Sequence, residues 1–147
     1  MFYVCEFEFI EDGGAMTALC LNDWGGATSG TDLEDAGECA ADWLACMVDD
    51  CLMNGTPLPP VRLGNEPTQG GKVIAIAVSR ELSDIPAMTA ADAARELGVS
   101  SARVAQLINA GMLDSWKEGT RRMVSRASVQ ARLEDSPKTG RPKTAMV

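Results

Sequence analysis

The sequence of 147 residues contains no histidine, a single tyrosine and few aromatic residues of any kind, 5% in all. Without histidine, the chain lacks the Ser-His and Cys-His pairs of nucleophilic catalysis and the usual general base near neutral pH. We therefore expect a protein that is not an enzyme.

Paired cysteine motifs are also missing. Five cysteines occur, at positions 5, 20, 39, 46 and 51, and none of them forms a CxxC pair. An odd number without this spacing argues against a disulfide framework and a structural zinc site. The sequence predicts reduced thiols that pack as small hydrophobic side chains, with no bound metal and no cofactor.

Long apolar runs are absent as well. No stretch approaches the length of about 18 apolar residues that a transmembrane helix requires. The first residues, MFYVCEFEFIEDGG, lack the basic start and continuous apolar core of a signal peptide. These features predict a cytoplasmic protein with no membrane partner.

Basic residues are scarce in the first part of the chain. Residues 1–84 hold 3 basic and 15 acidic residues, a net charge of −12, whereas residues 85–147 hold 10 basic and 6 acidic residues, a net charge of +4. The two values account for the −8 of the whole chain. Such asymmetry is compatible with one surface for nucleic acid and another for a basic partner.

Composition marks the domain boundaries. Residues 54–72 concentrate Pro, Gly and Asn and predict a long loop, and residues 79–88 form a plausible connector. We divide the chain into an acidic domain at residues 1–80, a linker at residues 81–87, a basic domain at residues 88–135 and a disordered tail at residues 136–147. In the tail, three basic residues add weak attraction to phosphates: Lys138, Arg141 and Lys143.

The acidic domain begins with patterns typical of strands. Residues 2–10 alternate, which predicts one face formed by Tyr3, Cys5, Phe7 and Phe9 and a solvent-facing side with Val4, Glu6 and Glu8. The EDGG stretch at residues 11–14 predicts a turn into a second strand at residues 15–23. A short third strand is expected around residues 27–29, and an apolar run at residues 72–79 predicts a central strand.

A helix is predicted over residues 31–55. Thr31 followed by Glu34 matches a capping box, and Asn54-Gly55 is a suitable helix end. Apolar residues at helical spacing predict the buried face, formed by Leu33, Ala36, Ala40, Leu44, Met47 and Cys51. The resulting order predicts an α+β domain, a small antiparallel sheet with one long helix.

The stretch EDGGAMTALCLNDWGGATSGTDLEDAGECAADWL, followed by GTPLPP, resembles the N-terminal domain of the HicB antitoxin family. The shared features, over residues 2–78, are Asp23, Gly25-Gly26, Thr28, Gly30, Leu33 to Ala36 and Pro57 to Pro60. The chain departs from the family where Gly26-Ala27 replaces a Gly-Cys pair, and where no acidic residue separates Gly30 from Thr31.

This resemblance implies a partial RNase H-like fold without nuclease activity, which binds and neutralises a small, basic, mRNA-cleaving toxin of the HicA type. The residues that we assign to toxin binding are Asp23, Trp24, Asp32, Glu34, Asp35 and Glu38. Trp24 is either an exposed anchor in its glycine-flanked loop or a cap on the core. Four acids in turns or at the helix start are expected to be solvated rather than to hold metal: Asp12, Asp23, Asp32 and Glu34.

The basic domain carries a predicted helix–turn–helix. Thr89 and Asp92 mark the start of a helix that ends at Gly98, and Ser100 or Ser101 begins a second helix that ends at Gly111. Residues 112–125 predict a two-stranded wing with a turn at residues 118–120, and Ser125 begins a last helix that contains Ala127, Val129 and Leu133.

This order, carried by LGVSSARVAQLINAG, RRMVSRASV and Leu133, resembles the excisionase/MerR-like winged DNA-binding domain. In that arrangement the second helix enters the major groove, and the wing meets phosphates or a minor groove. The residues that we assign to DNA binding are Ser100, Ser101, Arg103, Gln106, Lys117, Arg121, Arg122 and Arg126. Because the recognition helix itself carries few basic residues, we expect a homodimer or higher oligomer on double-stranded operator DNA.

The sequence therefore predicts an antitoxin that neutralises a HicA-like toxin and represses its own operon. The main alternative is a stand-alone transcriptional regulator whose first domain senses a ligand. A second alternative is an enzyme with RNase H-like chemistry, for which cleavage that depends on Mg²⁺ or Mn²⁺ is the test.

Overall fold

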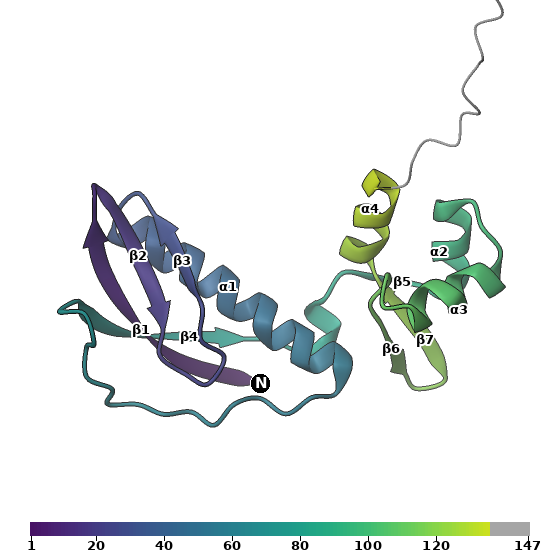
Figure 1. Cartoon of the computed structure of the whole chain (residues 1–147). Coiled ribbons are helices and arrows are strands. Elements are labelled where there is room, and N and C mark those ends of the chain that lie inside the picture. Colours follow the sequence, from purple (N-terminus) through teal and green to yellow (C-terminus); the bar gives the residue numbers. More distant parts are fainter. Residues whose placement is uncertain (136–147) are drawn as a thin grey trace, which may run out of the picture. The chain divides into compact units, whose positions relative to one another are not determined.

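The computed structural model describes residues 1–135, so the predicted tail lies outside the described residues. The chain forms two compact units that divide between Asp84 and Ile85. We call them unit 1 and unit 2, and each is described by itself (Figure 1). No helix among the described residues is both long and apolar enough to cross a membrane.

Unit 1 contains a four-stranded antiparallel sheet in the order β3-β2-β1-β4. Its strands are β1 (Phe2–Asp12), β2 (Ala15–Cys20), β3 (Ala27–Gly30) and β4 (Lys72–Ser79). The predicted hairpin is confirmed: Gly13 and Gly14 join β1 to β2 with φ values of 58° and 86°, which glycine adopts readily. The prediction of a central strand at residues 72–79 is wrong, because β1 and β2 occupy the centre and β4 has β1 as its single neighbour.

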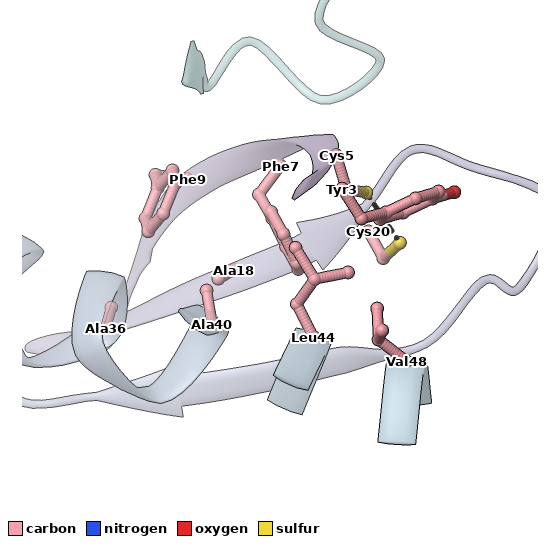
Figure 2. Close-up of a cluster of buried hydrophobic side chains, with 10 residues drawn as sticks. All are labelled: Tyr3, Cys5, Phe7, Phe9, Ala18, Cys20, Ala36, Ala40, Leu44 and Val48. Atoms are coloured by element: carbon pink, nitrogen blue, oxygen red, sulfur yellow. Dashed lines mark hydrogen bonds between the residues drawn. The ribbon is translucent and has the colours of Figure 1, made fainter. Parts of the chain in front are cut away.

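One long helix, α1 (Leu33–Asn54), packs against one face of this sheet. The predicted inner face of β1 is confirmed, since Tyr3, Cys5, Phe7 and Phe9 are all buried there. Figure 2 shows them opposite the helix residues that complete the core, Ala36, Ala40, Leu44 and Val48. The predicted buried face of the helix is wrong at two positions. Leu33 is 42% exposed, and Val48 rather than Met47 is fully buried.

The start of α1 also differs from the prediction. Asp32, not Thr31, is the N-cap, and its Oδ1 accepts a hydrogen bond from the Asp35 N–H at 2.8 Å. Asp35 reaches back, because its Oδ2 accepts a bond from the Thr31 N–H at 2.7 Å. The cap is therefore reciprocal, but it is made by two aspartates. The predicted end is confirmed, with Gly55 in the left-handed conformation.

The side of β1 that faces away from α1 contradicts the expectation of a solvent-facing surface. Glu6 is 8% exposed and Glu8 is fully buried. The segment between α1 and β4, residues 56–71, crosses this side, and we call it the strap. Its backbone N–H groups bind the two carboxylates, which explains how acidic side chains become buried here.

Glu8 is the more completely bound of the two. It accepts bonds from the N–H and the hydroxyl of Thr68 and from the N–H groups of Gln69 and Gly71. Burial raises the pKa of Glu8, but these four hydrogen bonds outweigh it and lower the pKa to about 2. Gly71 is required here, because an added Cβ would lie 2.5 Å from the carbonyl oxygen of Phe9.

Glu6 holds the preceding part of the strap. Its carboxylate accepts bonds from the N–H groups of Gly64 and Asn65 and from the Asn65 side-chain amide. The bond from Gly64 lowers the pKa of Glu6, and the bonds from Asn65 add to this effect against the opposing effect of burial. A further bond, from the Tyr3 hydroxyl to the carbonyl of Pro59 at 2.9 Å, fixes the strap near its start.

Unit 2 confirms the predicted helix–turn–helix and wing. Its elements are β5 (Ala87–Thr89), α2 (Ala90–Leu97), α3 (Ser101–Asn109), β6 (Ser115–Glu118), β7 (Arg121–Ser125) and α4 (Arg126–Asp135). The strands form a sheet in the order β5-β7-β6, so β5 adds an unpredicted third strand to the wing. A short 3₁₀ helix, Leu82–Asp84, ends unit 1.

The core of unit 2 is small and mostly aliphatic. Its buried residues include Ala93, Val104, Leu107, Val124 and Val129. The predicted last helix does contain Leu133, which is 40% exposed and lies outside this core, in the last turns of α4. Ser125 caps α4 as predicted, because its hydroxyl accepts a bond from the Ser128 N–H at 3.2 Å.

Candidate nucleic-acid interface

Two local caps fix the position of α3 relative to α2. Gly98 ends α2 with φ of 66°, and its N–H binds the carbonyls of Ala94 and Arg95. Ser100 then starts α3, because its hydroxyl accepts a bond from the Arg103 N–H at 3.1 Å. The turn between the helices is therefore three residues long, residues 98–100, and begins with a glycine, as is common in helix–turn–helix units.

The exposed side of α3 carries all four residues that the sequence assigned to base reading. Ser100, Ser101, Arg103 and Gln106 are exposed, while Val104 and Leu107 point into the core. Arg103 Nη1 donates to Gln106 Oε1 at 3.2 Å, so these two side chains lie together one turn apart. The Ser100 hydroxyl oxygen uses one lone pair to accept the Arg103 N–H, so its second lone pair and its proton remain for a ligand.

The wing places further cations on its two strands. Lys117 on β6 lies opposite Arg122 on β7, so both side chains project from one face of the sheet. Arg121 lies opposite Glu118 and projects from the other face. Arg122 Nη1 also donates to the Ser115 hydroxyl at 3.1 Å. All three cations are exposed, and Arg126 at the start of α4 is exposed as well.

Residues 87–136 match a family model described as a helix-turn-helix domain. The match covers about a third of the chain and spans unit 2 from β5 to the end of α4. It supports a DNA-binding regulatory role for this part of the protein. No curated protein and no solved structure was found to match the chain, and the resemblance of residues 2–78 to the HicB family rests on their motifs alone.

In unit 1 the structure separates the six residues that the sequence assigned to toxin binding. Asp23 is exposed in the β2–β3 loop, with its Oδ2 3.7 Å from Arg62 of the strap. Trp24 is half-buried, which contradicts an exposed anchor and matches the alternative of a cap on the core. The centroid of its ring lies 5.3 Å from the ring centroid of Tyr3 and 6.4 Å from that of Trp43.

The other four assigned residues lie at the start of α1. Asp32 and Asp35 are used by the helix cap, whereas Glu34 and Glu38 are exposed and make no hydrogen bond or ion pair within residues 1–135. Asp42 follows them at the same spacing and is exposed too. We call Glu34, Glu38 and Asp42 the acidic stripe. The sequence analysis missed Asp42 as a member, although its i+4 spacing from Glu38 was the signal.

Two depressions lie near the β1–β2 hairpin of unit 1. One has a volume of about 280 Å³ and is lined by Ile10, Glu11, Asp12, Thr17, Leu19 and Gln69. The other, of about 180 Å³, lies between the hairpin and the start of α1. Both are smaller than typical small-molecule pockets, which run from about 300 to 1,000 Å³. Within residues 1–135, no three cysteine, aspartate or glutamate side chains gather as a metal site requires.

Proposed function

We propose that the protein is a transcriptional repressor and antitoxin in which unit 2 binds operator DNA and unit 1 neutralises a basic toxin of the HicA type. The observation that supports DNA binding is the helix-turn-helix domain at residues 87–136, with exposed cations on α3 and the wing. The observation that supports a basic partner is the acidic stripe on α1, within a unit of net charge −12.

In this proposal α3 enters the major groove by its N-terminal end. Arg103 contacts a guanine edge through its guanidinium, and Gln106 contacts an adenine edge. Lys117, Arg121 and Arg122 on the wing, together with Arg126, contact phosphates or a minor groove. The neighbouring positions of Arg103 and Gln106 support this assignment, because the two side chains can reach adjacent base pairs from one turn of helix.

Binding as a dimer follows from the modest charge of unit 2. Its described residues, 85–135, contain 7 basic and 6 acidic residues, so the attraction of one copy to DNA phosphates is weak. Two copies joined in one assembly bind with a higher effective affinity, because the second contact becomes intramolecular. A two-fold assembly also matches a palindromic operator.

The acidic stripe supports the second half of the proposal. Like charges spaced four residues apart destabilise a helix, so Glu34, Glu38 and Asp42 do not stabilise α1 by their mutual spacing. A toxin that grips RNA phosphates presents cationic surface, and complementary charge speeds encounter and fixes orientation. On this proposal the antitoxin acts by covering the surface with which the toxin binds RNA, and no covalent bond is made or broken.

Co-expression with the adjacent open reading frame tests the proposal. A basic protein of well under a hundred residues, toxic when expressed alone and harmless when co-expressed, is the expected result, and the two chains should co-purify. The absence of such a neighbour would favour the stand-alone regulator. DNA binding is measured separately, by fluorescence anisotropy of duplexes selected from a random library, so that each half of the proposal can fail independently.

Charge reversal on the acidic stripe tests the surface itself. Glu34→Lys with Glu38→Lys should weaken the toxin complex and leave DNA binding unchanged. The same reversal at Asp32 and Asp35 is a poor probe, because these carboxylates form the α1 cap and their loss unfolds its first turn. Circular dichroism checks that the Glu34/Glu38 variant remains helical. An unchanged toxin complex in the Glu34/Glu38 variant would remove the stripe from the interface.

A further inference from the structure

One edge of the unit 1 sheet is open. β4 is the last strand in the order β3-β2-β1-β4 and pairs with β1 over eight residues, from Lys72 to Ser79. Within residues 1–135, its outward backbone groups take part in no hydrogen bond. A strand with a free row of N–H and C=O groups is a template for pairing with another strand.

The open edge lacks the usual protection against such pairing. Proteins blunt an exposed edge with charges, proline, bulges or short strands. β3, the opposite edge, is short and ends at Gly30, whose Cα lies so near α1 that an added Cβ would come within 2.4 Å of the Ala36 nitrogen. β4 is twice as long, and between Val73 and Ser79 it has neither a charge nor a proline.

The charge distribution favours a second copy of the chain at this edge. Unit 1 contains three basic residues, and two of them, Lys72 and Arg80, lie at the two ends of β4. Arg80 binds both carboxylate oxygens of Asp49, at 2.8 and 2.7 Å, and the contact raises the pKa of Arg80. β4 itself contains no acidic residue and the Arg80–Asp49 pair is neutral, so two molecules with a net charge of −12 on this unit repel each other less at this edge than across their exposed acidic side chains.

The side chains of β4 match their own copies in an antiparallel pair. Ile74, Ile76 and Val78 face α1 and are half-buried at the margin of the core, while Ala75 and Ala77 project from the other side and are exposed. A two-fold axis perpendicular to the sheet keeps both helices on one face, so aliphatic residues meet aliphatic residues and alanines meet alanines. Cross-strand pairs of β-branched residues stabilise such a ladder.

We infer that two copies of the chain associate through antiparallel pairing of their β4 strands, which joins the two sheets of unit 1 into one continuous eight-stranded sheet. This inference rests on the proposed function in one respect, namely that the dimer is used to bind DNA. The pairing itself depends on unit 1 alone. It places two copies of unit 2 in one assembly without requiring any contact between them.

The test is the molar mass of the full chain in solution, measured by light scattering after size exclusion. Ala75→Lys with Ala77→Lys puts four lysines around the two-fold axis of the pair, on positions that are exposed in one copy. The matched control is Ala27→Lys with Ser29→Lys, which adds the same charge to exposed positions of the opposite edge strand. Circular dichroism and amide exchange in the strap confirm that both variants are folded.

The wild type and the control should have twice the molar mass of the Ala75/Ala77 variant at the same concentration. Wild-type amides of β4 should also become better protected as protein concentration rises. A wild type with the mass of one chain at every concentration, or equal masses for all three proteins, would overturn the inference. So would an Ala75/Ala77 variant that keeps its mass but loses the toxin, because the edge would then belong to the partner. No DNA enters the mass measurement, so equal masses of two chains in all three proteins would overturn the β4 pairing and leave the proposed function standing. A wild type with the mass of one chain would overturn the pairing and also remove the dimer from the DNA-binding proposal.

Discussion

Side-chain hydrogen bonds to the backbone span very different distances along the sequence in the two units. In unit 1 the buried carboxylate of Glu8 binds Thr68 and Gly71, which are 60 and 63 residues away. In unit 2 the caps of α2, α3 and α4 each join residues three positions apart. Unit 1 therefore uses two of its acidic side chains to fix its own fold, whereas the cations on α3 and on the wing of unit 2 are exposed.

This difference separates two kinds of charge that composition alone cannot distinguish. Glu6 and Glu8 count toward the −12 of residues 1–84, yet the strap covers them and they are lost to any partner. Glu34, Glu38 and Asp42 contribute to the same total and are exposed. The acidic side chains that are accessible to a basic protein are thus a subset of those in the sequence, and three of them form the stripe on α1.

The largest expected effect comes from emptying the core of one unit while leaving the other intact. Phe7 is fully buried in unit 1, so Phe7→Ala should lower the free energy of unfolding of that unit by about 3–5 kcal/mol. Leu107→Ala should lower that of unit 2 by about 2–5 kcal/mol, because Leu107 is 3% exposed. Amide exchange, resolved by mass spectrometry into peptides from each unit, measures the two effects.

If the units are as separate as their cores indicate, each substitution should loosen its own unit and leave the amides of the other protected. Phe7→Ala should also retain the DNA sequence preference of unit 2, with a lower affinity because unit 1 joins the two copies in the inferred dimer. Equal loss of protection in both units after either substitution would show that they unfold as one body, and the division of labour between them would have to be abandoned.

Removal of one strap anchor is expected to have the next largest effect. In Glu8→Gln, the side-chain amide presents an NH₂ group to backbone N–H groups that need an acceptor, so the part of the strap around Gln69 should detach. Amide exchange at Thr68 and Gly71 should rise clearly. Glu11→Gln is the control, because the Glu11 side chain is exposed and makes no hydrogen bond or ion pair among residues 1–135.

Acid provides a second measure of the same contact. The pKa of Glu8 is lowered to about 2 in the fold, against about 4.3 in an unfolded chain. The stabilisation is therefore complete above the unfolded value and is lost as the pH falls from about 4 toward 2. NMR signals of the strap amides should shift over this range in the wild type and in Glu11→Gln. A strap that stays ordered in Glu8→Gln at all pH values would refute the role of the carboxylate.

The same contrast explains what the sequence can and cannot predict. Three features each depend on three or four consecutive residues: the cap at Ser100, the turn at Gly98 and the hairpin at Gly13-Gly14. Their conformations therefore follow from local chemistry. The strap was predicted only as a loop. Its partner residues on β1 alternate with Phe7 and Phe9 as solvent-facing residues do, and nothing local indicates that residues near position 68 will cover them.

The candidate site residues also differ in whether local sequence or tertiary packing determines their positions. Arg103 and Gln106 are three residues apart on one helix, so their proximity follows from helical spacing. The position of Trp24 depends instead on whether Tyr3 and Trp43 approach it, and only the packed core decides that. The cap at Asp32 was predicted one residue early because Thr31 and Asp32 are both good N-caps, and the geometry of the preceding strand selects between them.

A smaller effect is expected from a single base-reading residue. Arg103→Ala should weaken binding to a selected duplex by about 1–3 kcal/mol and relax the sequence preference at one position. Arg95→Ala is the matched control, because Arg95 is an exposed arginine on α2 that pairs with Asp92. Fluorescence anisotropy measures both, and toxin neutralisation should be unchanged in each. Equal losses for Arg95 and Arg103 would show that only total charge matters and that α3 does not read the groove.

The smallest expected effect concerns a single hydroxyl group at the start of α3. Ser100→Ala removes the hydroxyl that accepts the Arg103 N–H and should lower the free energy of unfolding of unit 2 by about 1 kcal/mol, the usual value for an N-cap serine. Ser101→Ala, one residue on, makes no such contact within residues 1–135 and should change stability by less than about 0.5 kcal/mol. Urea unfolding followed by amide exchange in α3 distinguishes the two. If Ser101 proved the more costly loss, Ser101 rather than Ser100 would be the N-cap of α3, and the helix would begin one residue later.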